Sequence, residues 1–156
     1  MATKRNQKAA GEKMANNSQM EKSASQIKGK IGEYQFIGEL LRRGFDVYLP
    51  IADIRGIDCV IRSPSGKYIE IQVKLRVTKG SGKDIFEVRN FQARNNFFIV
   101  CKRDDWDKFW IFPSKVFEKF SKFREKYNSR RLILNQKKRK NLKIYEDNFQ
   151  QLLCIV

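Results

Sequence analysis

The chain has 156 residues, 41% of them hydrophobic, so its length and composition fit a single domain with a sizeable core. Its 33 Lys and Arg against 17 Asp and Glu give a formal charge of +16, which points to a polyanionic partner. There is no His, which excludes His-based triads, HExxH zinc sites and Cys₂His₂ fingers, and three widely spaced Cys without a CxxC pattern are typical of reduced thiols in an intracellular protein.

The first 24 residues are rich in Lys, Asn, Ala, Ser and Gln and have almost no apolar periodicity. This composition cannot bury enough surface to offset the entropy of ordering, which predicts a disordered basic arm over residues 1–24 and a folded domain over residues 25–156. The arm either tethers the protein to nucleic acid or has no role of its own. No segment is apolar enough to cross a bilayer, so we expect no membrane partner and a cytoplasmic or nucleoid-associated protein.

An amphipathic helix is expected from Gln26 to Arg43, with Gly44 as a left-handed cap. Its apolar residues recur at helical spacing: Ile31, Tyr34, Phe36, Ile37, Leu40 and Leu41. Glu33 shares the apolar face that should meet a sheet, because it precedes Phe36 and Leu40 by three and seven residues.

A carboxylate on that face must be paired or must bind something, or it is a helix-start Glu that interacts with the helix dipole. Gly29 and Gly32 flank Glu33 and are expected to let the helix approach the sheet closely. A short strand over residues 45–49 follows the helix and ends at Pro50.

A β-hairpin is predicted next, because two runs of β-branched and aromatic residues flank the turn cluster at residues 63–66. Alternation places one set of apolar side chains on a common face: Ile57, Cys59 and Ile61 from the first strand, and Ile69, Ile71, Val73 and Leu75 from the second. Pairing Arg62 with Tyr68 sets Val60 opposite Glu70.

The same register sets Asp58 opposite Gln72 on the polar face of the hairpin, with Lys74 following on that face. A carboxylate, an amide oxygen and an ammonium on one patch can hold a divalent cation and a phosphate together. The alternative is an ordinary solvent-facing polar side.

Further strands are expected at residues 86–88, 97–101 and 109–112. Ser114 is expected to cap a helix whose apolar stripe is Val116, Phe117, Phe120 and Phe123. A short final helix over residues 146–153 is expected to pack Phe149, Leu152 and Leu153.

Most of the positive charge falls into two segments, since residues 1–32 carry +5, residues 119–143 carry +10 and the remainder +1. Charge concentrated in this way favours a phosphate-binding footprint over an evenly solvated surface. The predicted nucleic-acid-binding residues bracket an apolar strand at residues 132–134; they are Arg130, Arg131, Lys137, Lys138, Arg139 and Lys140.

Three stretches together resemble the core of the PD-(D/E)XK nuclease superfamily. They are GKIGEYQFIGELLRRGFDVYLP (residues 29–50), the strand that begins with GID (residues 56–58) and EIQVK (residues 70–74). The match covers roughly residues 27 to 76 and is similar to Holliday-junction resolvases and to group I intron homing endonucleases built on this fold. It implies an α/β fold with a restriction-endonuclease-like mixed β-sheet flanked by helices.

The resemblance implies roles for individual residues. Asp58 would be the metal-binding Asp, Gln72 the second ligand, Lys74 the catalytic Lys and Glu33 the helix Glu that many members add. Mg²⁺ or Mn²⁺ would be held by Asp58, Gln72 and the Val73 carbonyl. Gln72 departs from the usual acidic residue and brings no charge to the metal.

Three functions remain open from the sequence: a metal-dependent DNA endonuclease, a non-catalytic DNA-binding protein that keeps the fold, and a structural or RNA-associated basic protein. For the first, the substrate is double-stranded or branched DNA. One site cuts one strand, so cutting both strands of a two-fold-related target favours a homodimer or homotetramer.

Overall fold

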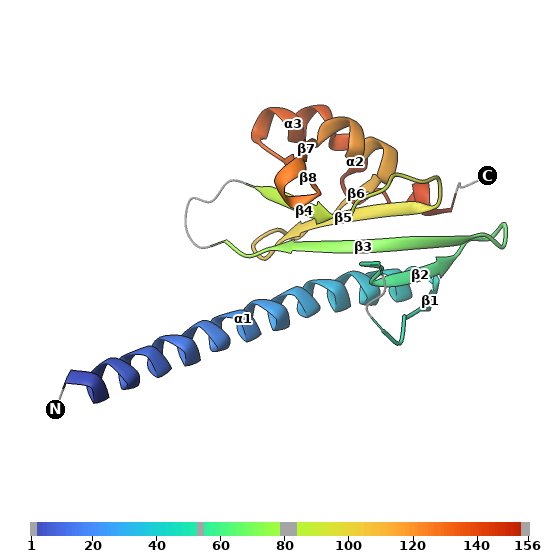
Figure 1. Cartoon of the computed structure of the whole chain (residues 1–156). Helices are drawn as coiled ribbons and strands as arrows, with labels where there is room; N and C mark the ends of the chain where they lie inside the picture. Colours follow the sequence, from blue (N-terminus) through green and yellow to red (C-terminus); the bar gives the residue numbers. More distant parts are fainter. Residues whose placement is uncertain (1–2, 53–54, 79–83, 154–156) are drawn as a thin grey trace.

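The computed structural model describes residues 3–52, 55–78 and 84–153 and, within the first helix, the side chains of Met20, Ser23, Ala24 and residues 26–42 (Figure 1). The elements in chain order are α1 (Thr3–Arg42), β1 (Asp46–Tyr48), β2 (Cys59–Arg62), β3 (Tyr68–Arg76), β4 (Ile85–Arg89), β5 (Phe97–Arg103), β6 (Trp110–Pro113), α2 (Ser114–Phe120), β7 (Lys122–Arg124), β8 (Ser129–Ile133) and α3 (Gln136–Asn141). Three short 3₁₀ helices complete the fold: η1 (Glu125–Tyr127), η2 (Lys143–Tyr145) and η3 (Phe149–Leu152). None of the helices described is both long and apolar enough to span a bilayer.

A five-stranded mixed sheet forms the centre of the protein, in the order β1-β2-β3-β5-β6. The pair β3 and β5 is parallel, whereas the other neighbours are antiparallel. The second sheet is antiparallel and has the order β4-β8-β7. This architecture confirms the predicted α/β fold with a mixed sheet flanked by helices.

The central sheet is covered on both faces, with α1 on one side and the second sheet with α2 and α3 on the other (Figure 1). Alternation along β5 shows the two layers, because Phe98 and Val100 join the core under α1 while Phe97 and Ile99 join the core under α2. β3 therefore lies in the middle of the fold, where its backbone is fixed by strands on both edges.

The predicted hairpin is confirmed in its register. Arg62 pairs with Tyr68 and Val60 with Glu70. The predicted apolar face is buried at Cys59, Ile61, Ile69, Ile71 and Val73. Period-two alternation and a Pro-Gly turn were sufficient to define this element because both strands bury one face.

The helix α1 differs from the prediction at its start, since it begins at Thr3 and so includes residues 3–24, for which the sequence predicts a disordered arm. The segment has no Pro and contains many good helix formers such as Ala, Lys, Gln and Glu, so the helix can continue through it. Residues 1 and 2 lie outside the described residues.

The buried side of α1 is also narrower than predicted. Phe36, Ile37 and Leu40 are buried, whereas Tyr34 and Leu41 are exposed. Apolar residues occur on two sides of this helix, and a single periodicity does not separate them.

Three predictions for the C-terminal half are wrong. Ser114 is the first residue of α2 and Pro113 is its cap. Phe123 belongs to β7 and is exposed instead of continuing the α2 stripe. The final helix is the 3₁₀ turn η3, which buries Phe149 and Leu152 but leaves Leu153 at the surface.

The cysteines follow the expected pattern where the structure describes them. Cys59 and Cys101 are free and buried. Burial, together with the charges of Asp58 and Glu33, raises the pKa of the Cys59 thiol to about 12, which makes it unreactive. Cys154 lies outside the described residues.

Candidate active site

Asp58 lies directly before β2 and is anchored to β3. Its backbone N–H donates to the Ile71 carbonyl at 2.9 Å, and its Oδ2 accepts the Val73 N–H at 2.6 Å. The carboxylate is therefore held at the edge of β3, against the peptide between Gln72 and Lys74. The N–H and C=O of one strand residue point to the same edge, so the Val73 carbonyl faces this edge too.

A turn with left-handed backbone leads into Asp58, with φ of 60° at Arg55 and 67° at Gly56. A Cβ on Gly56 would lie 2.3 Å from Gln72 Nε2, so a side chain there would have to displace the Gln72 amide as well as adopt a left-handed φ. The Gln72 side chain that packs against Gly56 is buried, at 7% exposure. Gly56 therefore fixes both the approach of Asp58 and the position of the Gln72 side chain.

Glu33 comes to the same edge of β3 from α1. The helix approaches closely at Gly32, where an added Cβ would lie 2.8 Å from Leu75 Cβ. This confirms the predicted role of Gly32. A Cβ on Gly29 would have no atom within 4 Å, so Gly29 is not needed for a close approach of the helix. The Glu33 carboxylate is mostly buried and accepts from Lys30 Nζ at 2.6 Å.

Glu33 and Asp58 line one pocket of about 300 Å³, together with Lys30 and Tyr34. Burial raises the pKa of Asp58 to about 6. The nearby charge of Glu33 also raises this pKa, while the Val73 N–H and the charges of Lys74 and Lys30 lower it. Two carboxylates that repel each other in a confined pocket are a favourable environment for a cation.

The oxygen donors on the two sides of the Val73 peptide are of the kind that a hard divalent cation prefers. Asp58 and Glu33 supply carboxylates, Gln72 an amide oxygen and Val73 a backbone carbonyl. Across the described residues no group of three or more His, Cys, Asp or Glu side chains could hold a metal. The set thus fits Mg²⁺ or Mn²⁺ only when the amide, the carbonyl and a substrate phosphate complete it.

Gln72 and Lys74 face a second, larger cleft on the other side of the strand edge. This cleft has a volume of about 1010 Å³ and is lined by both β3 and the segment that follows β4. Its basic and amide side chains, apart from the two on β3, are Arg55, Arg89, Asn90, Gln92 and Arg94.

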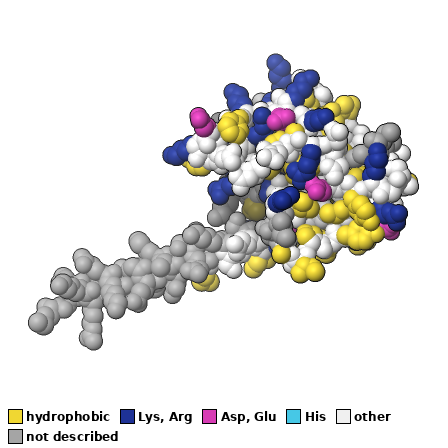
Figure 2. Space-filling model, turned by 45° about the vertical axis from the view of Figure 1, so that its right-hand side comes forward, with side chains coloured by type: hydrophobic (Ala, Val, Ile, Leu, Met, Phe, Trp, Pro, Cys, Tyr) yellow, Lys and Arg dark blue, Asp and Glu magenta, His cyan; other side chains and the backbone are white. Residues whose placement is uncertain are grey.

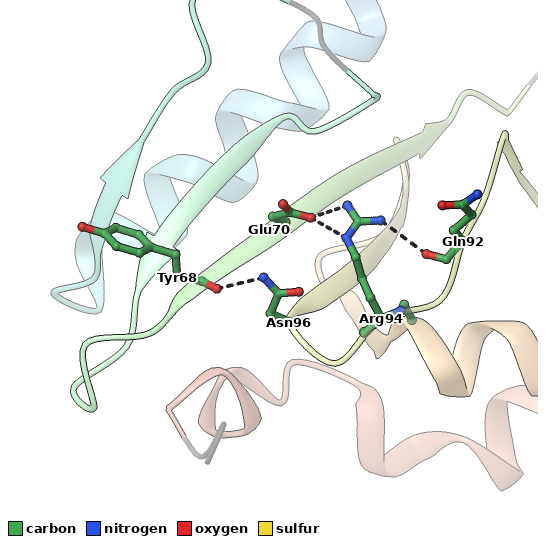
Figure 3. Close-up of polar contacts among 6 residues, drawn as sticks. Tyr68, Glu70, Gln92, Arg94 and Asn96 are labelled. Atoms are coloured by element: carbon green, nitrogen blue, oxygen red, sulfur yellow. Dashed lines mark hydrogen bonds and ion pairs between the residues drawn. The ribbon is translucent and has the colours of Figure 1, made fainter.

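Arg94 is held rigidly at this cleft (Figure 3). Its guanidinium donates to the Glu70 carboxylate, with Nε at 2.6 Å, and stacks over the Phe97 ring at 4.0 Å. Its backbone is bonded through both N–H and C=O to the buried hydroxyl of Ser114. A fixed cation that lines the same cleft as Lys74 makes this cleft suited to a phosphate.

The sequence did not single out these cleft residues. Arg89 and Arg94 lie in a part of the chain whose net charge is nearly zero, and the charge distribution gave them no weight. The run of Asn, Gln and Arg after β4 was an available signal, since these are the side chains that contact phosphates and base edges.

The predicted nucleic-acid-binding residues are placed differently from the predicted catalytic ones. Arg131 donates to Glu87 at 2.9 Å, and Arg130 pairs with Glu118 at 3.1 Å. Lys138 donates to the Phe120 carbonyl at 2.7 Å, and Arg139 lies 5.4 Å from the Trp106 ring. None of these four lines the large cleft. Lys137 and Lys140 are exposed on α3.

The described surface in Figure 2 shows Lys and Arg side chains spread over the body of the protein, with few acidic ones between them. The structure thus places Asp58 and Glu33 at a pocket on one side of the β3 edge and Gln72 and Lys74 at the large cleft on the other side, with Val73 between them. The basic residues of β8 and α3 lie elsewhere.

Comparison with known proteins identifies the family and the fold of this chain. A family described as PD-(D/E)XK endonuclease matches residues 23–149. Among solved structures, a bacterial homing endonuclease, I-Ssp6803I, shares the fold with a TM-score of 0.59 and 21% sequence identity, over 82% of this chain and 92% of that one. No curated protein sequence gives a significant match. Because the family match spans most of the chain and includes every predicted catalytic residue, this chain belongs to the PD-(D/E)XK endonuclease family.

Proposed function

We propose that this protein is a divalent-metal-dependent DNA endonuclease whose active site is Asp58, Gln72, Lys74 and Glu33. The observation that carries the proposal is the bond from the Val73 N–H to Asp58, at 2.6 Å. It holds a half-buried carboxylate between an amide and an ammonium, with a second carboxylate beside it. Family membership supports nuclease activity.

The residues that would hold Mg²⁺ or Mn²⁺ are Asp58, Gln72 and the Val73 carbonyl, with Glu33 as an outer carboxylate. Bound there, the cation supplies Lewis-acid polarisation of the scissile phosphate and makes water more acidic. Members of this family generally use divalent metals. Because Gln72 is neutral, the affinity for metal depends mainly on Asp58, Glu33 and the substrate.

Lys74 acts on the phosphate from the cleft side of the strand. Its charge is close enough to Asp58 to lower the pKa of that carboxyl, so the two groups act on the same small volume. An ammonium there stabilises negative charge developing on the phosphate and orients water for in-line attack.

The large cleft is the path of the DNA. Arg55, Arg89 and Arg94 provide phosphate contacts, while Asn90 and Gln92 have the donor and acceptor groups that contact base edges. The Glu70 carboxylate holds Arg94 in place before DNA binds. The substrate is double-stranded or branched DNA, and a homodimer or homotetramer supplies one site for each strand.

The test is a nicking assay on supercoiled plasmid and on a branched duplex, with and without Mg²⁺ or Mn²⁺. We expect metal-dependent cleavage that is lost in Asp58→Ala and in Lys74→Ala. Asp46→Ala and Lys115→Ala are matched controls, because both side chains are exposed and lie outside the site. Full activity in either site variant would contradict the assignment.

A non-catalytic DNA-binding protein is the second candidate, and the neutral Gln72 at a ligand position favours it. DNA binding without cleavage under any divalent metal would select this alternative. A cleavage activity that appears only in Gln72→Glu would select it too.

A further inference from the structure

The helix α1 has a second apolar face that nothing in the described chain covers. Five large side chains on it are exposed: Met20 (72%), Ile27 (59%), Ile31 (49%), Tyr34 (62%) and Leu41 (57%). The buried residues Phe36, Ile37 and Leu40 contact the sheet from the other side of the helix. At about 100° per residue, the centres of the two groups lie about 130° apart around the helix.

The exposed face has the spacing of a helix-packing seam. Met20, Ile27, Tyr34 and Leu41 are seven residues apart, and so are Ala24, Ile31 and Gly38. The two series alternate three and four residues apart, which is the a and d pattern of a coiled coil. A seam of this kind is complementary to another helix, because knobs of one helix fit holes of the next.

Nothing else in the described part of the chain provides that second helix. α1 packs on β3 and β1, and its N-terminal part extends beyond the sheets (Figure 1). A helix that projects without tertiary contacts is only marginally stable. Figure 2 shows hydrophobic side chains on the surface along the edge of the body next to α1.

We infer that α1 pairs with α1 of a second copy of this chain, in an antiparallel arrangement about a two-fold axis. A seam carried by one chain is its own complement under two-fold symmetry, where residue i contacts residue j and j contacts i. The inference concerns assembly and does not depend on the chemistry proposed above.

The sizes of the seam residues select the antiparallel order. With the axis between Gly32 and Glu33, Ala24 faces Leu41 of the second copy, Ile27 faces Gly38 and Ile31 faces Tyr34. Each small residue then meets a large one, so the layers interdigitate. A parallel pair in register would place Ala24 on Ala24 and Gly38 on Gly38, which leaves voids in two layers.

The size of the seam is sufficient for a specific pair. Met20 lies outside this pairing, because the position that faces it is beyond the end of α1. A large side chain presents about 150–250 Å² when fully exposed, so the other four seam side chains present on the order of 500 Å² per chain. A two-fold pair would remove about 1,000 Å² in total, the size from which a complementary interface can be specific. Tyr34 also lines the pocket of Glu33 and Asp58, so the pair would fix the two sites relative to each other.

Light scattering and sedimentation equilibrium at micromolar concentration test the pairing. We expect an assembly of two or four 18.4 kDa chains, and we expect Ile27→Glu combined with Ile31→Glu to halve its mass. Ile144→Glu is the matched control, because Ile144 is 68% exposed but lies in η2. A monomeric wild type, or a folded double variant of unchanged mass, would overturn the inference.

Disulfide trapping tests the order of the two helices and does not require the double variant to fold. Two differently tagged chains, both with Cys154→Ser, are mixed: one carries Ile27→Cys and the other Gly38→Cys. The antiparallel pair predicts a mixed disulfide between them, since facing positions meet the required distance. A disulfide formed only between two Ile27→Cys chains would overturn the antiparallel order.

The nicking assay separates this inference from the proposed function. A monomeric Ile27→Glu, Ile31→Glu variant that still nicks supports both, because each active site is complete within one chain. An intact two-fold assembly without cleavage would contradict the endonuclease and leave the pairing supported.

Discussion

The β2–β3 edge and the basic segment at residues 119–143 are both rich in charge, but the fold compensates that charge differently. At the β3 edge, burial and Glu33 raise the pKa of Asp58 to about 6, so its ionised form is disfavoured. In the basic segment, Arg124 and Arg131 bind Glu87, and Arg130 binds Glu118. In these two regions, Asp58, a half-buried carboxylate with a raised pKa, marks the candidate site, whereas the arginines paired within the basic segment indicate scaffold.

The first prediction uses the cost of keeping Asp58 charged. Asp58→Asn is expected to lower cleavage by at least about a hundredfold, because the metal loses its only carboxylate fixed on β3. The same change should stabilise the fold at pH 7 to 8 by roughly 1–3 kcal/mol, since a neutral amide can still accept the Val73 N–H without the burial penalty of the ion.

The sign of this effect with pH follows from the raised pKa. The protonated form of Asp58 is favoured in the fold, so its contribution is fully present below about pH 4 and is lost as pH rises through about 6. The stability difference between wild type and Asp58→Asn should therefore vanish near pH 4 and grow towards pH 7. Urea unfolding at three pH values measures it, with exposed Asp46→Asn as the control. A constant difference would mean that Asp58 is not buried as described.

The second prediction divides the α3 basic cluster into free and paired members. Replacing Lys137 and Lys140 with Ala should flatten the slope of log K against log salt for DNA binding by up to about 0.9 per lost phosphate contact. Replacing Lys138 and Arg139 should leave the slope unchanged and lower stability, because these two contact Phe120 and Trp106. Equal slopes for both variants and the wild type would show that α3 faces away from DNA.

The third prediction concerns the neutral ligand position. Gln72→Glu should lower the metal concentration for half-maximal cleavage by about tenfold, because it adds a charge to the donor set. The two side chains are nearly equal in size, so the contact with Gly56 is kept. Gln92→Glu adds the same charge elsewhere in the cleft and serves as control. If Gln72→Glu prevents folding, Gln72 has a structural role instead.

The sequence predicted the hairpin and the position of Asp58 beside β3 because both depend on short-range pattern. The alternation around residues 63–66 set the register of β2 and β3, and that register brought Asp58 against the Val73 N–H, between Gln72 and Lys74 in β3. Glu33 could be placed because one carboxylate on an apolar helix face is anomalous.

The parts that the sequence did not predict depend on contacts between distant segments. Glu70 and Arg94 are 24 residues apart, and Glu87 and Arg131 are 44 residues apart, so no local pattern couples them. The outer face of α1 was not recognised because its apolar residues were assigned to the same side as Phe36. Two apolar faces on one helix become distinct only when one of them is seen to be buried.

The last prediction tests whether paired charge is scaffold. Arg131→Ala should lower the free energy of unfolding by roughly 1 kcal/mol, since Glu87 keeps Arg124 and Ser129 as partners. DNA affinity and its salt slope should change little, because the Arg131 guanidinium is already bound to Glu87. Arg62→Ala, at an exposed arginine of β2, is the control for removing one positive charge. A loss of affinity in Arg131→Ala beyond that in Arg62→Ala, at unchanged stability, would mean that Glu87 releases Arg131 to the DNA. The distinction between paired scaffold and free site would then fail at this position.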